Sequence, residues 1–339
     1  MKLSLKIGSV AIFLMALTAT SLWSLRPSSQ VVKMTVATVA SETVTKEPIT
    51  PIPKETELAA PKVALGEKLF NDPQLSHNNK VSCASCHSLA LGGTDQLTRS
   101  VGINGQQGNI NAPTVFNASY NFRQFWDGRA ETLEEQIDGP THAAAEMGSN
   151  WAEIIAKLRQ APEYVTAFAK LYPEGIQAQT IRDAIATFER SLTTPDSRFD
   201  QYLKGNQNAL SPAEKEGYQI FKSYGCISCH QGVSMGGNMY QKFGVMGDYF
   251  KDRGKLTEAD YGRYNVTKNE ADKFIFKVPS LRNVALTSPY FHDGSAKRLE
   301  DAVIVMGRYQ LGRELAPTEI AALVKFLQTL TGEYKRYES

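Results

Sequence analysis

The sequence has almost no excess of charge of either sign. Its 339 residues include 37 lysines and arginines and 35 aspartates and glutamates, a formal net charge of +2 at pH 7. Because both signs are mixed along the chain, this composition excludes a basic nucleic-acid-binding tail and a polybasic membrane patch. Segments with the apolar–polar alternation of half-buried strands are also lacking, which favours a mainly α-helical fold. The length is sufficient for two ordinary domains.

A long apolar run occurs at the N-terminus, from Ile7 to Leu25, where it follows Lys2 and Lys6. A basic start followed by an uncharged apolar segment is typical of an export signal. The run is also near the length that can span a bilayer. Residues 1–25 are therefore expected to be a cleaved signal peptide or a retained membrane anchor, and residues 26–56, rich in Val, Thr, Ser and Pro, a flexible linker. Both alternatives place the rest of the chain outside the cytoplasm.

Cysteine is scarce, and all four cysteines belong to two copies of one pattern. The copies are Cys83-Ala84-Ser85-Cys86-His87 and Cys226-Ile227-Ser228-Cys229-His230. The pattern C-x-x-C-H is typical of c-type haem attachment, in which two thiols form thioethers and the histidine binds the iron. A disulfide framework or a zinc site would leave the histidine after each pair unexplained. The sequence therefore predicts two covalently bound haems of the c type.

The two motifs lie a domain length apart, so we expect one cytochrome c-like domain over residues 57–205 and a second over 206–339. Helical periodicity supports this fold. Apolar residues recur at helical spacing between Gln177 and Leu192 and again between Pro317 and Gly332. Ser211-Pro212 is typical of a helix start just before the second motif. The prediction is two mainly α-helical domains, each carrying one haem.

The sixth iron ligands decide what each haem can do, and spacing does not identify them. His87 and His230 supply the fifth ligands. The remaining histidines are His77, His142 and His292, and the second half also contains Met235, Met239, Met246 and Met306. A methionine is more often core filler than a ligand.

Longer stretches carry a family resemblance. The chain resembles the bacterial dihaem cytochrome c peroxidases, together with the related oxidase that matures tryptophan tryptophylquinone, from about Leu65 to Gly332. The matching stretches are Asn111-Ala112-Pro113-Thr114, Gln124-Phe125-Trp126-Asp127-Gly128-Arg129, Leu281-Arg282-Asn283-Val284-Ala285-Leu286-Thr287, Pro289-Tyr290-Phe291-His292 and Met306-Gly307.

The resemblance implies a division of labour between the haems. The haem on His87 would react with hydrogen peroxide, and the haem on His230 would accept electrons from a reduced monohaem cytochrome c or a small copper protein. Met306 would be the sixth ligand of the second haem, which raises its reduction potential. Trp126 matches the tryptophan that the family uses as an electron bridge between the haems.

The resemblance also implies the peroxide pocket and a cation site. Glu146 and Gln136 match the family's distal pair, in which the carboxylate moves a proton as general base and then acid and the amide holds peroxide or water. Asn111, with backbone oxygens near Thr287 and Pro289, matches a calcium site, and oxygen donors suit Ca²⁺. A periplasmic location and a homodimer are expected on the same basis.

One position departs from the family. Many members carry a histidine at the position of Ile103, where it blocks the peroxide-reacting iron until the other haem is reduced. Isoleucine cannot ligate iron, so we hypothesise a five-coordinate or water-bound first haem that needs no reductive activation. His142, four residues before Glu146, is an alternative ligand.

Two other functions compete with the peroxidase. One is a dihaem oxidase that uses peroxide to modify a partner protein; that relative has a tyrosine at the position of Met306. The other is a pure electron-transfer dihaem cytochrome. It requires two strong ligands on both irons, which Ile103 argues against.

Overall fold

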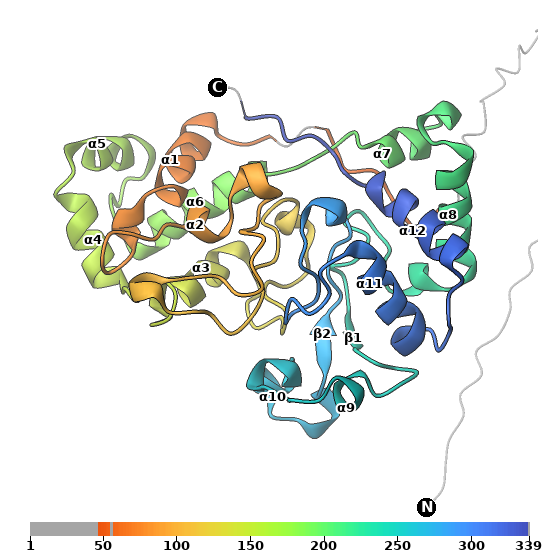
Figure 1. The fold of residues 1–339 in the computed structure, drawn as a ribbon. Coiled ribbons are helices and arrows are strands. Elements are labelled where there is room, and N and C mark those ends of the chain that lie inside the picture. Colours follow the sequence, from red (N-terminus) through yellow and green to blue (C-terminus); the bar gives the residue numbers. More distant parts are fainter. Residues whose placement is uncertain (1–46, 55–56, 338–339) are drawn as a thin grey trace, which may run out of the picture. The chain divides into compact units, whose positions relative to one another are not determined.

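The computed structural model describes residues 47–54 and 57–337. The predicted signal peptide or anchor, residues 1–25, and the predicted linker up to residue 46 lie outside the described residues. Within the described ranges, no helix has the length and apolar character needed to cross a membrane. These residues belong to one unit that is mainly helical, as the sequence predicts (Figure 1).

Twelve α-helices and one pair of strands lie in the described part of the chain. The helices before the second motif are α1 (Ala60–Phe70), α2 (Cys83–Cys86), α3 (Leu133–His142), α4 (Trp151–Arg159), α5 (Pro162–Leu171), α6 (Ala178–Ser191), α7 (Arg198–Leu203) and α8 (Pro212–Ser223). Those after it are α9 (Tyr249–Arg253), α10 (Tyr264–Thr267), α11 (Leu299–Val305) and α12 (Pro317–Gln328). The strands β1 (Tyr240–Lys242) and β2 (Ile275–Lys277) pair antiparallel, with Tyr240 opposite Lys277. At three residues each, they are too short to show an alternating pattern.

The three predicted helices, two from periodicity and one from its start at Ser211-Pro212, are confirmed. Helix α6 buries the predicted stripe of Ile181, Ala184, Ile185 and Phe188. Helix α8 begins at Pro212, after a capping box in which Ser211 N donates to Glu214 Oε2 at 2.8 Å and Glu214 N donates to Ser211 Oγ at 3.4 Å. Helix α12 begins at Pro317 and ends at Gln328, before Gly332.

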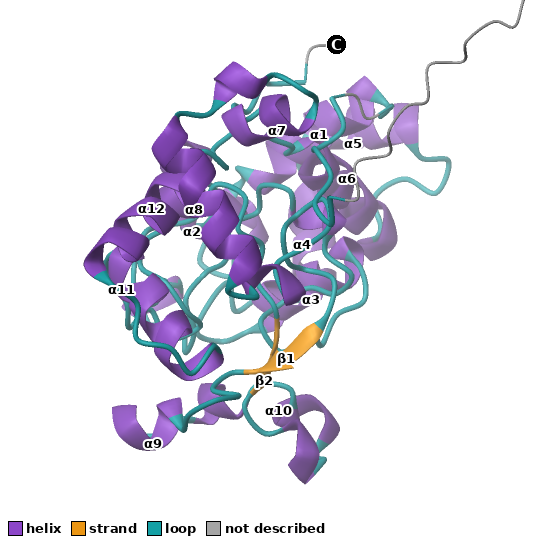
Figure 2. Cartoon of the chain, turned by 90° about the vertical axis from the view of Figure 1, so that its right-hand side faces the viewer, coloured by secondary structure: helices purple, strands orange, loops and turns teal. Residues whose placement is uncertain are grey.

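The buried apolar residues form two large clusters, and each is built on a closely packed helix pair. The first core cluster spans residues 63–192, and the second spans residues 199–330 with Ile49 added. Helix α1 lies beside α6 in the first cluster and α8 beside α12 in the second (Figures 1 and 2). A glycine permits each approach: a Cβ on Gly66 would lie 2.0 Å from Ala184 O, and one on Gly217 would lie 2.0 Å from Ala322 O.

Each end of the described chain packs on the cluster formed by the opposite half: the N-terminal end on the second cluster and the C-terminal end on the first. The N-terminal strap, residues 47–54, packs against the second cluster, and its Ile49 and Ile52 are only 2% and 1% exposed. The C-terminal tail, residues 333–337, returns to the first cluster. There Tyr334 packs beside Phe116, and Tyr337 Oη donates to Leu58 O at 2.7 Å.

This packing corrects the predicted extent of the linker. Composition favours a flexible segment up to residue 56, whereas residues 47–54 are held in place because their two isoleucines bury apolar surface. The domain division at residue 205 stays a prediction, but Phe199 and Tyr202 already belong to the second cluster or pack against it.

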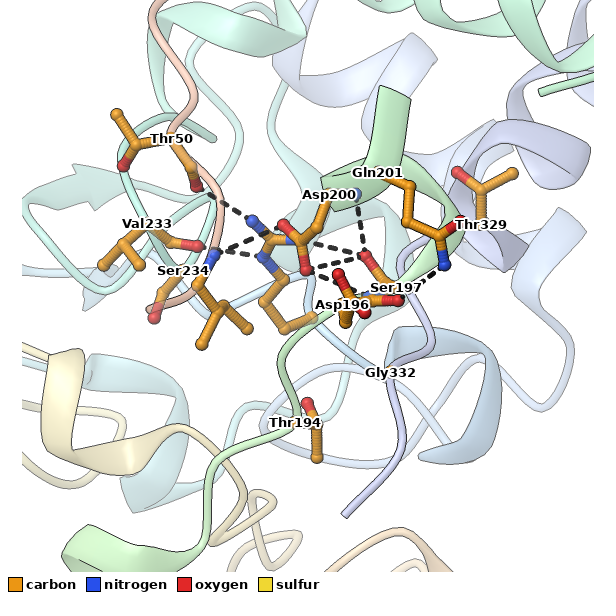
Figure 3. A network of polar contacts seen from close by, with 12 residues as sticks. Thr50, Thr194, Asp196, Ser197, Asp200, Gln201, Val233, Ser234, Thr329 and Gly332 are labelled. Atoms are coloured by element: carbon orange, nitrogen blue, oxygen red, sulfur yellow. Dashed lines mark hydrogen bonds and ion pairs between the residues drawn. The ribbon is translucent and has the colours of Figure 1, made fainter. Parts of the chain in front are cut away.

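A buried ion pair fixes the strap to the second cluster. Arg282 Nη1 lies 2.9 Å from Asp200 Oδ1, and both side chains are fully buried. Arg282 also donates to Thr50 O at 3.0 Å and to Val233 O at 2.9 Å, while Ser197 Oγ donates to Asp200 Oδ2 at 2.9 Å (Figure 3). A buried charge pair is tolerated when its other polar atoms are also bonded. The network therefore joins the strap, the start of α7 and the loop after the second motif.

Candidate functional site

The first motif is one turn of helix followed by its histidine. Helix α2 spans the motif from Cys83 to Cys86, and His87 N donates to Cys83 O at 2.9 Å. Ser82 N donates to Ser85 Oγ at 3.0 Å and fixes the start of the turn. The two thiols are free and half-buried, so the pair is available for thioether bonds.

The second motif reaches a similar arrangement through a 3₁₀ turn. Residues Cys226–Ser228 form this turn after α8, and His230 N donates to Cys226 O at 3.0 Å. Gly225 precedes the turn with φ 89°, a left-handed conformation that glycine adopts without strain. Cys226 and Cys229 are also free thiols.

Both motif histidines are prepared in the same way to bind a metal. Nδ1 of His87 lies 3.2 Å from Gly93 O, and Nδ1 of His230 lies 3.1 Å from Met235 O. Desolvation lowers the pKa of His87 and lowers the pKa of His230 to about 4. Each imidazole is therefore neutral at pH 7, donates its Nδ1 proton to a carbonyl and leaves Nε2 for a metal ion.

A cavity of about 560 Å³ opens beside the second motif. Its walls include Cys226, Cys229, His230 and the predicted sixth ligand, Met306. Met306 begins a π-helical turn, Met306–Gln310, directly after α11, and such turns are frequent at functional sites. The volume is in the range of cofactor pockets. Two thiols, a neutral imidazole and a thioether on its walls fit a haem.

Trp126 lies on the wall of the same cavity and is held from two sides. Its Nε1 donates to Asn111 O at 2.9 Å, and its carbonyl accepts from Lys277 N at 2.8 Å. Its ring stands edge-on to His292 at 6.3 Å. The predicted electron bridge is thus fixed to a residue that follows the first motif and to a residue that follows the second.

The three residues predicted to bind calcium all line this cavity: Asn111, Thr287 and Pro289. Asn111 is 6% exposed, and its Nδ2 donates to Leu97 O at 2.8 Å. This bond orients the side-chain amide and leaves its Oδ1 as a ligand atom. A side-chain amide oxygen with nearby backbone carbonyls suits Ca²⁺, and calcium at this place stays a prediction.

A buried charged cluster surrounds His292 and has no counterpart among the predicted sites. His292 Nε2 lies 2.8 Å from Asp260 Oδ1, and Arg253 Nη2 lies 2.7 Å from Asp260 Oδ2. Arg253 also pairs with Asp293. Arg253 thus bridges the two carboxylates, and Asp260 in turn fixes the ring of His292. Arg253 and Asp260 lie in a segment without periodicity, which gave no signal.

Glu146 and Ile103 lie together near the first motif. Ile103 N donates to Glu146 O at 2.8 Å. A side chain at Gly102 would not fit, because its Cβ would lie 2.0 Å from Ala145 O. Residues 102–103 and 145–146 are therefore in close backbone contact. Burial raises the pKa of Glu146, and Arg129 opposes that rise. Burial raises the pKa of the Cys86 thiol, and the nearby charges of Asp95 and Glu146 add to that rise. The structure therefore brings the predicted catalytic carboxyl close to the first haem-attachment motif.

The other residues predicted for this pocket are Gln136 and His142. Gln136 is half-buried on α3, and its place in the peroxide pocket stays a prediction. His142 is exposed, and its ring packs against that of Trp151 at 6.0 Å. This position gives no support to His142 as a substitute iron ligand. His77 is also exposed and pairs with Glu153.

Comparison with known proteins agrees with this geometry. Residues 60–208 match the family described as di-haem cytochrome c peroxidase. The chain is 49% identical over 292 residues to cytochrome c peroxidase Ccp of Escherichia coli, covering 86% of this chain and 62% of that protein. It is 48% identical over 288 residues to cytochrome c551 peroxidase of Nitrosomonas europaea, covering 85% of each.

A solved structure shares the fold over nearly the same extent. The crystal structure of a MauG-like protein associated with microbial copper homeostasis superposes with a TM-score of 0.75 at 30% identity, covering 86% of this chain and 95% of that one. The chain spans less than two thirds of the Escherichia coli relative but most of the Nitrosomonas europaea one. These matches confirm the family predicted from the motifs: the chain belongs to the di-haem cytochrome c peroxidases.

Proposed function

We propose that this protein is a periplasmic cytochrome c peroxidase. It reduces hydrogen peroxide to two molecules of water and consumes two electrons and two protons. The electrons come from a reduced monohaem cytochrome c or a small copper protein. The observation that carries the proposal is that the two motif histidines, which make similar hydrogen bonds, lie in different surroundings. His230 shares its cavity with Met306, whereas the motif of His87 lies near a partly buried carboxyl, Glu146.

The residues fit two covalently held haems. One would be held by Cys83, Cys86 and His87, and the other by Cys226, Cys229, His230 and Met306. Bound haem supplies the iron that exchanges electrons and cleaves the peroxide bond. A histidine–methionine pair favours a high potential, which suits the haem that accepts electrons. Trp126, anchored on the wall of the cavity beside the second motif, would carry electrons between the two haems.

Glu146 carries the proton chemistry. With haem bound, it would act as general base and then as general acid, taking a proton from one oxygen of hydrogen peroxide and giving it to the oxygen that leaves as water. Burial raises its pKa, which moves the carboxyl toward the working pH and makes the carboxylate a stronger base for the first step. Gln136 has the side chain to hydrogen-bond peroxide, and this role stays a prediction.

The first haem requires no reductive activation in this proposal. Ile103 is 6% exposed and packs in the first core cluster, and its N–H is bonded to Glu146 O. An aliphatic side chain therefore occupies the place of the blocking histidine. The as-isolated, fully oxidised protein should react with peroxide at once.

Rapid mixing tests this function. The oxidised protein is mixed with hydrogen peroxide and then with reduced cytochrome c. Immediate turnover supports the proposal. Turnover that appears only after pre-reduction would show that another side chain blocks the iron and would contradict the role given to Ile103.

The same experiment, together with cyanide-binding spectra, separates the competing functions. A stable oxidised state without turnover of the donor would favour the oxidase that modifies a partner protein. Absence of cyanide binding to either haem would favour a pure electron carrier. Met306 on the cavity wall with His230 favours the peroxidase. Bound calcium, the homodimer and the membrane anchor stay predictions.

A further inference from the structure

Lys277, the last residue of β2, is a buried lysine on the wall of the haem cavity. Its residue is 7% exposed, and its backbone N–H is bonded to Trp126 O. The neighbouring Phe276 packs against His292 with ring centroids 4.5 Å apart. Lys277 is therefore held between the tryptophan and the pocket of the second motif.

The Lys277 ammonium has no partner among residues 47–54 and 57–337. Burial alone lowers its pKa to about 8, with no neighbouring charge or hydrogen bond acting on it. By contrast, Arg282, the other strongly buried cation of this half, has Asp200 at 2.9 Å. A buried, unpaired charge is strongly disfavoured, so Lys277 lacks the partner that the fold gives to Arg282.

The composition of the cavity wall indicates what that partner is. Two lysines, Lys277 and the exposed Lys242, line the cavity, but no aspartate or glutamate does. The remaining surface is largely apolar, apart from the thiols and imidazoles of the predicted haem ligands and a few amides and hydroxyls. The protein therefore supplies positive charge and no negative charge to a pocket that fits a haem, and a haem carries two propionate carboxylates.

We propose that the Lys277 ammonium pairs with a propionate carboxylate of the haem held by Cys226, Cys229 and His230. This inference rests on the proposed function. A charge-assisted bond of this kind satisfies both groups in a site where neither has another partner. Lys277 is thereby a positioning and tuning residue: it orients the haem edge near Trp126 and compensates a negative charge beside the iron.

Compensation of this charge has a direct electrochemical consequence. Reduction of the iron removes one unit of positive charge, so a nearby unpaired carboxylate disfavours the reduced state. A lysine that neutralises the carboxylate raises the reduction potential, in the same direction as the methionine ligand. The two devices together suit a haem that must accept electrons from a donor.

The test is a reductive titration of the fully loaded protein. We expect Lys277→Met to lower the equilibrium constant for reducing the methionine-ligated haem at least tenfold, which is about 59 mV for one electron. Lys277→Arg, which retains the charge, should stay within threefold of the wild type. Lys325→Met, at an exposed position of α12, removes a lysine elsewhere in the same half and should not change the constant.

An unchanged constant in Lys277→Met would overturn the proposal. An equal fall in Lys277→Met and Lys277→Arg would also overturn it, because packing and not charge would then be responsible. If Lys277→Met does not retain the second haem, haem content decides: retention in Lys277→Arg alone supports the pair, and loss in both contradicts it. Fewer than two haems in the wild type would contradict the proposed function itself, so the two failures are distinguishable.

Discussion

The two C-x-x-C-H motifs present nearly the same proximal arrangement in different surroundings. In both, the histidine N–H is bonded to the carbonyl of the first motif cysteine, and Nδ1 lies 3.1–3.2 Å from a later backbone carbonyl. Around the first motif, however, the structure places Ile103 and a partly buried carboxyl, Glu146. Around the second, it places Met306, Trp126 and an unpaired lysine in one cavity.

This difference shows where the function of each site is determined. The motif fixes the cofactor and one iron ligand, and those features are common to both halves. Whether a haem reacts with peroxide or accepts electrons depends on side chains that lie far from the motif in the sequence, such as Glu146 and Met306. The predictions below test that asymmetry by removing the distinctive groups of each half.

Removal of the Glu146 carboxyl should have the largest effect on catalysis. Glu146→Gln should lower the rate of peroxide reduction about 100-fold or more, the usual contribution of a general acid–base group. Burial raises the pKa of this carboxyl, and the base must be ionised to accept a proton. The rate of the wild type should therefore fall as the pH drops through a value above the usual carboxyl range, and the variant should lose this dependence.

The measurement is a stopped-flow pH profile with hydrogen peroxide. Glu174→Gln, at an exposed position before α6, is the matched control and should behave as the wild type. A Glu146→Gln rate within a factor of three of the wild-type rate would exclude Glu146 as the proton carrier.

Breaking the buried ion pair should mainly affect the second half. Arg282→Met leaves Asp200 charged without its partner, and loss of one member of a buried pair costs about 3–5 kcal/mol. Arg282 also holds the loop that begins at Val233. The absorbance of the second haem should therefore change at a lower temperature than in the wild type, as followed by thermal melts.

The control for this effect is an exposed ion pair. Arg298→Met removes the surface pair with Asp301, in which Arg298 is 69% exposed, and such pairs contribute little. Equal melting of Arg298→Met and Arg282→Met would mean that the buried network has no special role in stability.

A methionine comparison sharpens the assignment of the sixth ligand. Met306→Ala should lower the equilibrium constant for reducing the second haem about tenfold, because the thioether ligand raises the potential. Met246 lines the same cavity but is 62% exposed, so Met246→Ala should leave the potential and the methionine-ligation spectrum unchanged. Loss of that spectrum in Met246→Ala, with retention in Met306→Ala, would transfer the assignment to Met246.

The smallest expected change is in the rate at which the oxidised protein reacts with peroxide when residue 103 is substituted. Ile103→His restores a possible ligand next to Glu146 and should make the oxidised protein several times slower with peroxide. Pre-reduction of the second haem should recover the rate. Spectra of the oxidised variant that remain high-spin at the first haem would show that residue 103 cannot reach the iron from this backbone position.

Much of this molecule could be predicted from local patterns. The helices α6, α8 and α12 follow from apolar periodicity and from Ser211-Pro212, because packing of an amphipathic stripe determines them locally. The haem motifs follow from a short, specific spacing, and the family follows from the resemblance of longer stretches. The residues of the distal pocket follow from the family resemblance; the structure places Glu146 near the motif, and the role of Gln136 stays a prediction.

What could not be predicted depends on contacts between distant segments. The pairing of Arg282 with Asp200, the cluster of Arg253, Asp260 and His292, and the isolation of Lys277 have no signature in sequence order. A lysine in a short strand reads as a solvated residue until the fold buries it. The strap at residues 47–54 was missed because two isoleucines are too few to show a period.

The exchanged ends of the chain also determine how the protein responds to a break. The loop between α7 and α8 contains exposed residues such as Gly205, which are natural targets for a protease. A nick there would give two fragments, of which the first still carries the strap packed on the second, and the second still carries the tail packed on the first. The two fragments should therefore stay associated after the nick, held together by the non-covalent contacts of the strap and the tail.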